Sequence, residues 1–396
     1  METKTIGSKP ALAVCGALAL AALVAWAFQQ MQGLSLTGMS NLNSWGLYII
    51  CFMFFVGLSA GGLIVASSAT VFHIEKYKKV ALPAVILSTV CICLAGAFIL
   101  IDLGGIQRIW CMVVGLHFTS PLAWDMIVIT CYLIINILYL YFMCAKNADR
   151  SKIVYVSRVA LPVAILVHTI TAWIFGLQIG REGWYSAIMG PLFVTSALDS
   201  GLALLILALL WLDKKSVFKT EKSLIASLAG LMVTCVAVDG YLVGCEVLTS
   251  AYPGAEGFET ILMTMVSGAT APFFWFEVLF GILVPFCILL FKKNRENTGL
   301  VVLSSALIIA GVFCKRVWLL LTSFVYPNIS GTPGVSLGTV AAQQGDAWNV
   351  WGMAGSYAPT IPEVVITVGT VAFGVLAFIV LVNKLVPKSG NTASHK

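Results

Sequence analysis

Ten long apolar stretches constrain the fold of this chain more than any other feature of its sequence. Each is about 20 residues or longer, the length that a helix needs to cross the hydrocarbon core of a bilayer. They occupy residues 10–28, 45–72, 80–102, 121–144, 159–178, 190–212, 223–247, 271–291, 299–322 and 361–383. Of the 396 residues, 60% are hydrophobic and only 10% are charged, whereas about a quarter are charged in soluble domains. The sequence therefore predicts an all-α integral membrane protein with about ten transmembrane helices.

The basic residues alternate across the connections between these stretches. Nineteen of the 23 Lys and Arg residues lie near the two termini or in every second connection, while the opposite connections hold only Arg108 and Arg181. Lys and Arg are enriched in the cytoplasmic loops of membrane proteins. We therefore expect both termini to be cytoplasmic. The net charge of +6 is explained by topology, and no nucleic-acid partner is expected.

The first stretch allows two interpretations. It ends in Ala25-Trp26-Ala27, which is similar to a signal-peptide cleavage site, but it is longer than the apolar core of a usual signal peptide. We retain it as a span, with cleavage as the alternative. Residues 323–360 form the longest connection on the outer side and are rich in Gly, Pro and Ser. This outer loop is expected to cover a site or a partner.

A sequence repeat relates the two halves of the chain. The fourth span opens with Pro121 and continues to Trp124-Asp125, and the eighth opens with Pro272 and continues to Trp275 and Glu277. Because the offset is four spans, the two halves have the same orientation in the membrane. We predict a single polytopic membrane domain, 1–396, that contains two four-helix bundles, 45–178 and 190–322. The first and last spans are expected to be peripheral.

Ionisable side chains inside spans are expensive in lipid, so each is a candidate for function. The set comprises Asp125, His168, Asp199, Asp239, Glu246, Glu277, Lys315 and Arg316, and Asp102 and Glu363 lie at outer span ends. At about 1.5 Å of rise per residue, all of them lie at or above the midplane on the outer side. The chemistry of the chain is therefore predicted to lie in its outer half.

Each of these residues also has a structural interpretation. Asp199, Asp239, Glu277, Lys315 and Arg316 are predicted to form either a proton path or ion pairs, and Glu277 shares its depth with the two basic residues. Asp199 has the further alternative of a hydrogen bond to a neighbouring helix. His168 is expected either to exchange protons or to bond to Thr169 or Thr171.

The sequence predicts no redox cofactor bound to this chain. The 11 Cys residues are scattered, and none forms a C-x-x-C run that could hold an iron–sulfur cluster or zinc. His168 has no second His at its depth, so a bis-histidine haem is not expected. We expect no haem, no iron–sulfur cluster and no metal site.

Segments at the outer ends of the spans carry a recognisable set of motifs. The most specific are Asp102-Leu103-Gly104 with Arg108-Ile109-Trp110, and Ser120-Pro121 with Trp124-Asp125. Further matching segments are Trp45-Gly46, Gly57-Leu58-Ser59-Ala60-Gly61-Gly62, His168-Thr169 with Ala172-Trp173-Ile174-Phe175-Gly176, Arg181-Glu182-Gly183-Trp184-Tyr185, Gly190-Pro191-Leu192-Phe193, Ser196-Ala197-Leu198 with Gly201, and Tyr357-Ala358-Pro359-Thr360 with Glu363. Together they resemble the NrfD/PsrC family of membrane anchors, in its ten-helix branch.

The resemblance implies a quinone-reactive integral subunit of a multi-subunit respiratory oxidoreductase. Such a subunit lies in the cytoplasmic (inner) membrane of a bacterium or archaeon, binds menaquinone or another quinone as its substrate and serves anaerobic respiration. Electrons are exchanged with a ferredoxin-like iron–sulfur subunit on the outer face. The catalytic subunit is commonly a molybdopterin enzyme, with a hydrogenase or a multihaem cytochrome as alternatives.

The resemblance also implies a quinone pocket near the outer side of the first bundle. We expect His168 and Asp125 to be catalytic, because an unperturbed imidazole titrates at about pH 6.5 and a carboxylate can relay protons. The residues expected to line the pocket or its mouth are Ser120, Trp124, Asp102, Arg108, Gln178 and Arg181.

A secondary transporter is the alternative function. It would use the charged residues of the second bundle as its substrate or proton site. Transporters often contain inverted repeats, whereas an offset of four spans gives parallel repeats, which also occur among transporters. The resemblance favours the oxidoreductase subunit.

Overall fold

The computed structural model describes residues 6–40, 43–145, 150–181, 183–252, 258–325 and 357–386. Within these ranges ten helices are long and apolar enough to cross a membrane, which confirms the predicted all-α membrane fold. They are α1 (Lys9–Gln32), α2 (Leu47–Val71), α4 (Ala81–Asp102), α6 (Pro121–Cys144), α7 (Arg150–Gly176), α8 (Met189–Lys214), α9 (Lys222–Ala251), the three-part span Ala271–Leu290, α14 (Thr298–Val325) and α16 (Ile361–Leu385). Most of the outer loop predicted at 323–360 lies outside the described residues.

Helix α7 begins earlier than the apolar pattern predicts, at Arg150 instead of near residue 159. Its first turns carry Lys152 and Arg158, so the helix extends beyond the stretch that is apolar enough to be recognised as a span. The remaining spans begin and end within a few residues of their predicted limits. Hydropathy therefore located every span and underestimated the length of one.

The eighth span is not a regular α-helix. It consists of α11 (Ala271–Phe276), the π-helical segment η3 (Glu277–Leu283) and α12 (Val284–Leu290). Pro285 has no backbone N–H and its ring crowds the preceding turn, which explains why the regular hydrogen-bond ladder is interrupted here. Short π-helical turns are frequent at functional sites, and this one begins at Glu277.

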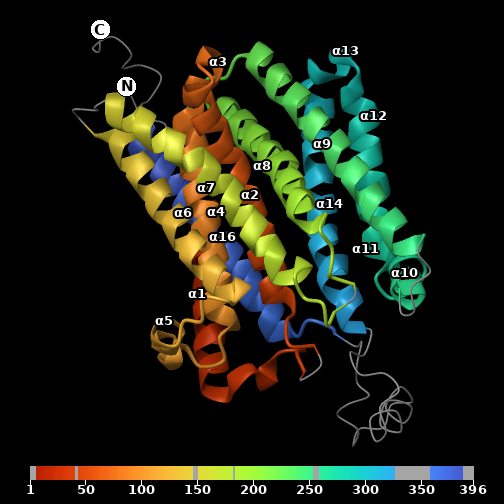
Figure 1. Cartoon of the computed structure of the whole chain (residues 1–396). Helices are drawn as coiled ribbons and strands as arrows, with labels where there is room; N and C mark the ends of the chain where they lie inside the picture. Colours follow the sequence, from red (N-terminus) through yellow and green to blue (C-terminus); the bar gives the residue numbers. More distant parts are fainter. Residues whose placement is uncertain are drawn as a thin grey trace, which may run out of the picture.

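Six short elements lie at the two ends of the spans. They are η1 (Gly33–Leu36), α3 (Glu75–Lys78), η2 (Ile106–Arg108), α5 (Trp110–Val114), α10 (Phe258–Val266) and α13 (Lys292–Arg295). Figure 1 shows α3 and α13 at one end of the molecule and α5 and α10 at the other. We call the first the basic end, because α3 and α13 carry Lys and Arg clusters, and the second the α5 end. That the basic end faces the cytoplasm stays a prediction.

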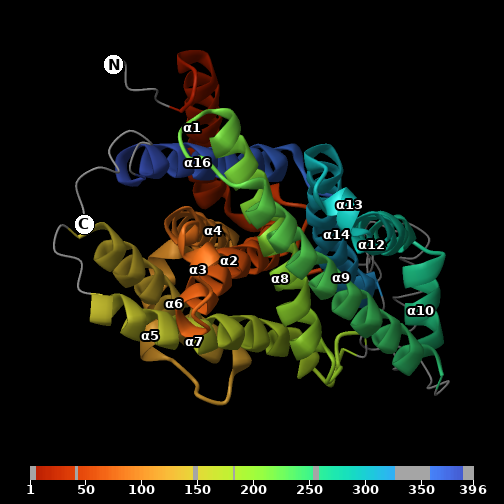
Figure 2. The same ribbon diagram turned by 90° about the horizontal axis from the view of Figure 1, so that it is seen from above.

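Helix α2 lies at the centre of the helix packing. It contacts α4, α7, α8 and α14, and Figure 2 shows it surrounded by these helices. We call α2, α4, α6 and α7 the first helix group, and α8, α9, α11–α12 and α14 the second. Each group is held together by contacts among its own members. Because α2 also packs extensively against α8, the division into two four-helix bundles stays a prediction.

Helices α1 and α16 pack against each other along one side of the molecule (Figure 2). Only 6% of the apolar window of α1 is buried, so this helix is exposed to lipid along most of its length. The backbone N–H of Ile6 donates to the Asn383 side chain at 2.9 Å, so the start of α1 and the end of α16 lie at the same end.

Two pairs of glycines allow close helix approaches. A Cβ atom on Gly61 of α2 would lie 2.1 Å from the carbonyl carbon of Gly201 in α8. A Cβ on Gly311 of α14 would lie 2.4 Å from the Cα atom of Gly281 in η3. Small residues let helix backbones meet in membranes, where van der Waals packing drives association. The first pair joins the two helix groups, and the second brings the π-helical segment against α14.

Candidate functional site

The first helix group buries one carboxylate near the α5 end. Asp125 lies in the second turn of α6, and its side chain is only 4% exposed. The Thr171 hydroxyl on α7 donates to Asp125 Oδ1 at 2.6 Å. A hydroxyl carries no charge, so Asp125 has a hydrogen-bond donor on the neighbouring helix but no ionic partner among the described residues. Such a carboxylate is suited to accepting and releasing a proton.

His168 lies one turn deeper than Thr171 on α7. Its Nδ1 atom contacts the carbonyl oxygen of Ala164, and its Nε2 atom lies 3.0 Å from the carbonyl oxygen of Val56 on α2. A neutral imidazole carries a single N–H, so only the imidazolium can donate to both oxygens. The partners of His168 are therefore backbone groups, whereas the sequence suggested the hydroxyls of Thr169 and Thr171.

Two tryptophan side chains pack together near the start of α6, beside Asp125 in the sequence. The rings of Trp124 and Trp173 meet edge to face with centroids 6.5 Å apart. The Trp124 indole N–H donates to the carbonyl oxygen of Phe118 at 2.6 Å, and Ser120 is the N-cap residue of α6. Trp and Tyr are enriched where a membrane meets water. The position of Trp124 therefore indicates that this end of α6 lies close to the membrane–water interface.

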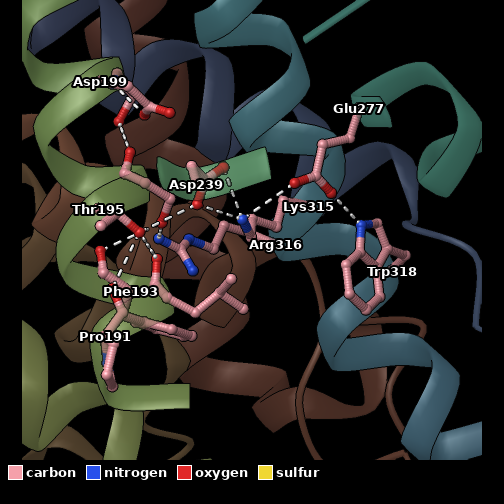
Figure 3. A network of polar contacts seen from close by, with 12 residues as sticks. Pro191, Phe193, Thr195, Asp199, Asp239, Glu277, Lys315, Arg316 and Trp318 are labelled. Atoms are coloured by element: carbon pink, nitrogen blue, oxygen red, sulfur yellow. Dashed lines mark hydrogen bonds and ion pairs between the residues drawn. The ribbon is translucent and has the colours of Figure 1, made fainter. Parts of the chain in front are cut away.

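The second helix group buries charges in direct contact. Lys315 Nζ on α14 lies 2.9 Å from Asp239 Oδ1 on α9 and 3.1 Å from Glu277 Oε1 at the start of η3. All three side chains are at most 1% exposed. The Trp318 indole N–H donates to the second oxygen of Glu277. Figure 3 shows Lys315 between the two carboxylates, an arrangement in which one ammonium group faces two acidic side chains.

Arg316 points away from that ion cluster, toward α8 and α2. Its Nη2 atom donates to the Ser196 hydroxyl at 2.8 Å, and its guanidinium carbon lies 3.9 Å from the centre of the Phe193 ring. The Nε and Nη1 atoms are buried without a hydrogen-bond partner among the described residues. The ionic contact of Glu277 is therefore with Lys315, and Arg316 is held by a hydroxyl and an aromatic face.

Two other intramembrane carboxylates have local partners. Asp199 is buried and accepts a hydrogen bond from the backbone N–H of Ser200. Glu246 accepts from the Ser186 hydroxyl at 2.6 Å. Among the described residues, no group of three or more His, Cys, Asp or Glu side chains is arranged to hold a metal ion.

The two helix groups place their polar residues in the same pattern. In the first, the carboxylate of the fourth span bonds to Thr171, three residues after His168. In the second, the carboxylate of the eighth span bonds to Trp318, three residues after Lys315. Residues three apart lie on the same face of a helix. This shared spacing in the fifth and ninth spans is a sequence signal from which the two pairs could have been found.

Comparison with known proteins decides the family. The family model for polysulphide reductase NrfD matches residues 35–328, which include α2 to α14. The chain belongs to the NrfD family. The match contains both helix groups and leaves α16 outside.

Three relatives are similar over almost their whole length. A protein of Halobacterium salinarum, provisionally named as a membrane subunit of dimethyl sulfoxide reductase, is 34% identical over 92% of this chain and 88% of its own. The Hdr-like menaquinol oxidoreductase integral membrane subunit of Archaeoglobus fulgidus is 29% identical over 91% of this chain and 89% of its own. A selenate reductase subunit of Mesobacillus selenatarsenatis is 22% identical over 93% of this chain and 92% of its own.

The other predicted pocket residues of this NrfD-family chain lie apart from Asp125. Arg181 donates to the carbonyl oxygen of Ser323 at the end of α14 and lies 4.5 Å from the centre of the Phe324 ring. Partial burial lowers the pKa of Arg181 from its usual value. Gln178 is exposed in the same connection. Gln178 and Arg181 therefore lie in the connection between α7 and α8, which the Arg181 hydrogen bond joins to the end of α14.

Arg108 and Asp102 occupy the connection between α4 and α6. Arg108 is exposed and lines a surface pocket of about 420 Å³ together with Leu34 and Met112. Asp102 ends α4, and its Oδ1 atom is buried without a hydrogen-bond partner among the described residues. Neither residue has a hydrogen bond or ion pair to Asp125 in the described structure.

The motif at the start of the last helix is a structural link. The two oxygens of Glu363 accept from the Tyr357 hydroxyl and from the backbone N–H groups of Gly38 and Thr360, each at 2.8 Å. Burial and the charge of Glu363 raise the pKa of Tyr357. The start of α16 is thereby fixed to the connection between α1 and α2. In this chain the family motif has a clear packing role.

Proposed function

We propose that this chain is the membrane subunit of a multi-subunit respiratory oxidoreductase and that it oxidises a quinol or reduces a quinone. Membership of the NrfD family supports this function, as do the names of the three relatives, which are all subunits of reductases or oxidoreductases. The name of the Archaeoglobus fulgidus relative supports menaquinone as the substrate.

The observation that carries the proposal is the placement of Asp125. Oxidation of a quinol to a quinone releases two protons and two electrons, so the site needs a proton acceptor near the edge of the membrane. Asp125 is a buried carboxylate whose bonded neighbour, Thr171, is uncharged. Asp125 would accept a proton from a quinol hydroxyl, and Trp124 and Trp173 would cover the ring of the substrate from water.

His168 would take part in the same proton exchange. Its two ring nitrogens face backbone oxygens of α7 and α2. Proton uptake by the ring would turn both contacts into hydrogen bonds, without any movement of the helices. Thr171 lies about one turn from His168 on α7 and donates to Asp125 on α6, so it would hold the carboxylate at a fixed place relative to the imidazole.

The two electrons would leave through a partner. No cofactor motif occurs in the sequence, so we propose that a ferredoxin-like iron–sulfur subunit docks at the α5 end and connects the quinone site to a catalytic subunit, a molybdopterin enzyme in the first instance. The cytoplasmic membrane of a bacterium or archaeon, with the basic end in the cytoplasm, is the proposed location.

The charges of the second helix group do not favour transport. Lys315 lies between Asp239 and Glu277, and the three side chains are buried against one another. A transported ion or substrate would have to displace one of these partners. Membership of the NrfD family gives the oxidoreductase subunit priority over the transporter alternative.

Purification of the tagged chain in a mild detergent tests this function. We expect an iron–sulfur subunit and a catalytic subunit to co-purify, and quinol oxidation by the complex to reduce an artificial electron acceptor. A matched preparation with Asp125→Asn should keep the same subunits and lose the quinol-dependent reduction. Two results together would contradict the proposal. The chain would purify without partner subunits, and membranes that also contain the proteins encoded by the neighbouring genes would show no quinol-dependent activity.

A further inference from the structure

A pocket with charged and apolar lining residues lies at the basic end, far along the helices from Asp125. It has a volume of about 480 Å³ and lies between the end of α8, the start of α9, α13 and the start of α14. Figure 1 shows α13 at the end of the molecule opposite to α5. The quinone chemistry proposed above uses none of the residues that line this pocket.

Three basic side chains line the pocket: Lys214, Lys222 and Arg295. Within the described ranges none of the three takes part in an ion pair. Two acidic residues, Asp213 and Glu296, also line it, and Asp213 accepts a hydrogen bond from the backbone N–H of Thr220. The formal charge of the lining, three positive against two negative, therefore favours an anion.

Two buried polar atoms in the lining lack partners. Arg295 Nε and Thr220 Oγ1 are both buried without a hydrogen bond among the described residues. Leaving such groups unpaired is unfavourable, and an anionic oxygen would accept from both. The guanidinium lies against α9, where a Cβ atom on Gly230 would be 2.8 Å from its Nη1 atom, and its Nη2 atom donates to the carbonyl oxygen of Leu290. The absence of a side chain at Gly230 thus provides the space that the Arg295 guanidinium occupies.

The start of α9 adds to the same electrostatic field. This 30-residue helix begins at Lys222 with no side-chain cap, and the free N–H groups of a first helical turn attract anions. The neighbouring carboxylate, Glu221, is engaged by Lys79 at 2.7 Å. The carboxylate of Glu221 therefore faces Lys79, at the end of α3.

The remainder of the lining is apolar and suits acyl chains. Leu207, Leu210, Ile225 and Val302 lie along the spans below the basic residues, and Trp211 lies beside them. A tryptophan at this level is typical of the boundary between headgroups and hydrocarbon. Cationic residues above an apolar wall match a phospholipid, whereas a free phosphate ion would use only the upper part.

We propose that this pocket binds the phosphate headgroup of an anionic phospholipid, with an acyl chain along α8 and α14. Basic pockets between transmembrane helices at the cytoplasmic side commonly bind such headgroups. The bound lipid would join α8, α9, α13 and α14, and so would hold the basic end of the second helix group together.

Native mass spectrometry of the full chain in detergent, titrated with phosphatidylglycerol or phosphatidylcholine, tests the proposal. The double variant Lys214→Gln with Arg295→Gln removes two lining cations. The matched control is Lys215→Gln with Lys293→Gln. It removes two exposed cations that do not line the pocket, one directly after α8 and one on α13. We expect phosphatidylglycerol to bind more tightly than phosphatidylcholine. The pocket variant should lose at least about tenfold in affinity, since each basic residue near an anionic surface contributes about fivefold, and the control should lose less than about twofold.

Three outcomes would overturn the proposal. Equal losses in the two double variants would show binding to surface charge in general. Equal affinity for the two lipids would exclude recognition of the anionic headgroup. Displacement of phosphatidylglycerol by millimolar inorganic phosphate, with phosphate retained by the protein, would make the ligand a free anion. If the pocket variant unfolds, Lys222→Gln alone provides the comparison, because Lys222 is an exposed residue at the start of α9.

Discussion

The two helix groups share a framework and differ in the charge of one position. Each places a carboxylate near the start of its third span and bonds it to a residue on the next span. In the first group the residue three places earlier on that span is His168, which contacts backbone oxygens. In the second it is Lys315, which contacts two carboxylates.

This difference separates chemistry from structure. A carboxylate bonded to a hydroxyl can change its protonation without leaving a cation unpaired. A carboxylate in contact with a buried ammonium cannot, because an uncompensated buried charge is strongly destabilising. We therefore expect changes in the first group to act on turnover and changes in the second to act on stability.

The largest effect is expected for Asp125→Asn. Quinol oxidation by the assembled complex should fall at least about 100-fold, since a positioned acid or base contributes about 10²–10⁴-fold to rate. The measurement is quinol-dependent reduction of an artificial acceptor, with the subunits present in the complex identified in parallel. Glu75→Gln, at an exposed carboxylate of α3 at the basic end, is the matched control and should keep the wild-type rate. A wild-type rate for Asp125→Asn in an intact complex would move the site to the second group.

Lys315→Met should lower the stability of the second group without a comparable loss in the first. Removing one partner of a buried ion pair costs about 3–5 kcal/mol, so the melting temperature in detergent should fall clearly. The double variant with Glu277→Gln should recover part of the loss, because one carboxylate fewer remains uncompensated. Losses that simply add in this double-mutant cycle would argue against coupling between the two residues. Lys293→Met is the exposed control.

His168→Ala should lower quinol oxidation about 100-fold, at the lower end of general acid–base effects, while the complex still assembles. The variant also removes the partner of the Val56 carbonyl oxygen, so a modest loss of thermal stability should accompany it. His168→Gln keeps one donor and should restore stability but not activity. Recovery of activity in His168→Gln would make His168 a packing residue.

The smallest effect is expected for Thr171→Val. This change removes one hydrogen bond to Asp125, and a net hydrogen bond contributes about 1 kcal/mol, so the rate should fall about fivefold. Thr171→Ser should restore it, and the pH profile of turnover should differ between the two variants. The counterpart Trp318→Phe removes the donor to Glu277 and should change stability with little effect on rate. An unchanged pH profile in Thr171→Val would exclude Thr171 as a positioning residue.

The sequence by itself determined the ten spans and their order. Hydropathy suffices for this because lipid requires every spanning backbone to form its hydrogen bonds internally, which leaves a continuous apolar stretch for each helix. The alternation of basic residues predicted that the basic connections lie on one side of the membrane. The two short helices that carry basic clusters, α3 and α13, do lie at one end of the molecule. The motifs around Asp125 and His168 indicated the family, which the comparison confirmed.

The tertiary structure decided which polar groups meet. Separation along the chain provided no reason to pair Lys315 with Asp239 or His168 with the carbonyl oxygen of Val56. The π-helical turn at Glu277 was also not predicted, although Pro285 could have indicated it. The physical reason is that depth in the membrane follows from counting residues along one helix. The direction in which a side chain points depends on how neighbouring helices rotate and pack, which here is set by close contacts such as that between Gly61 and Gly201.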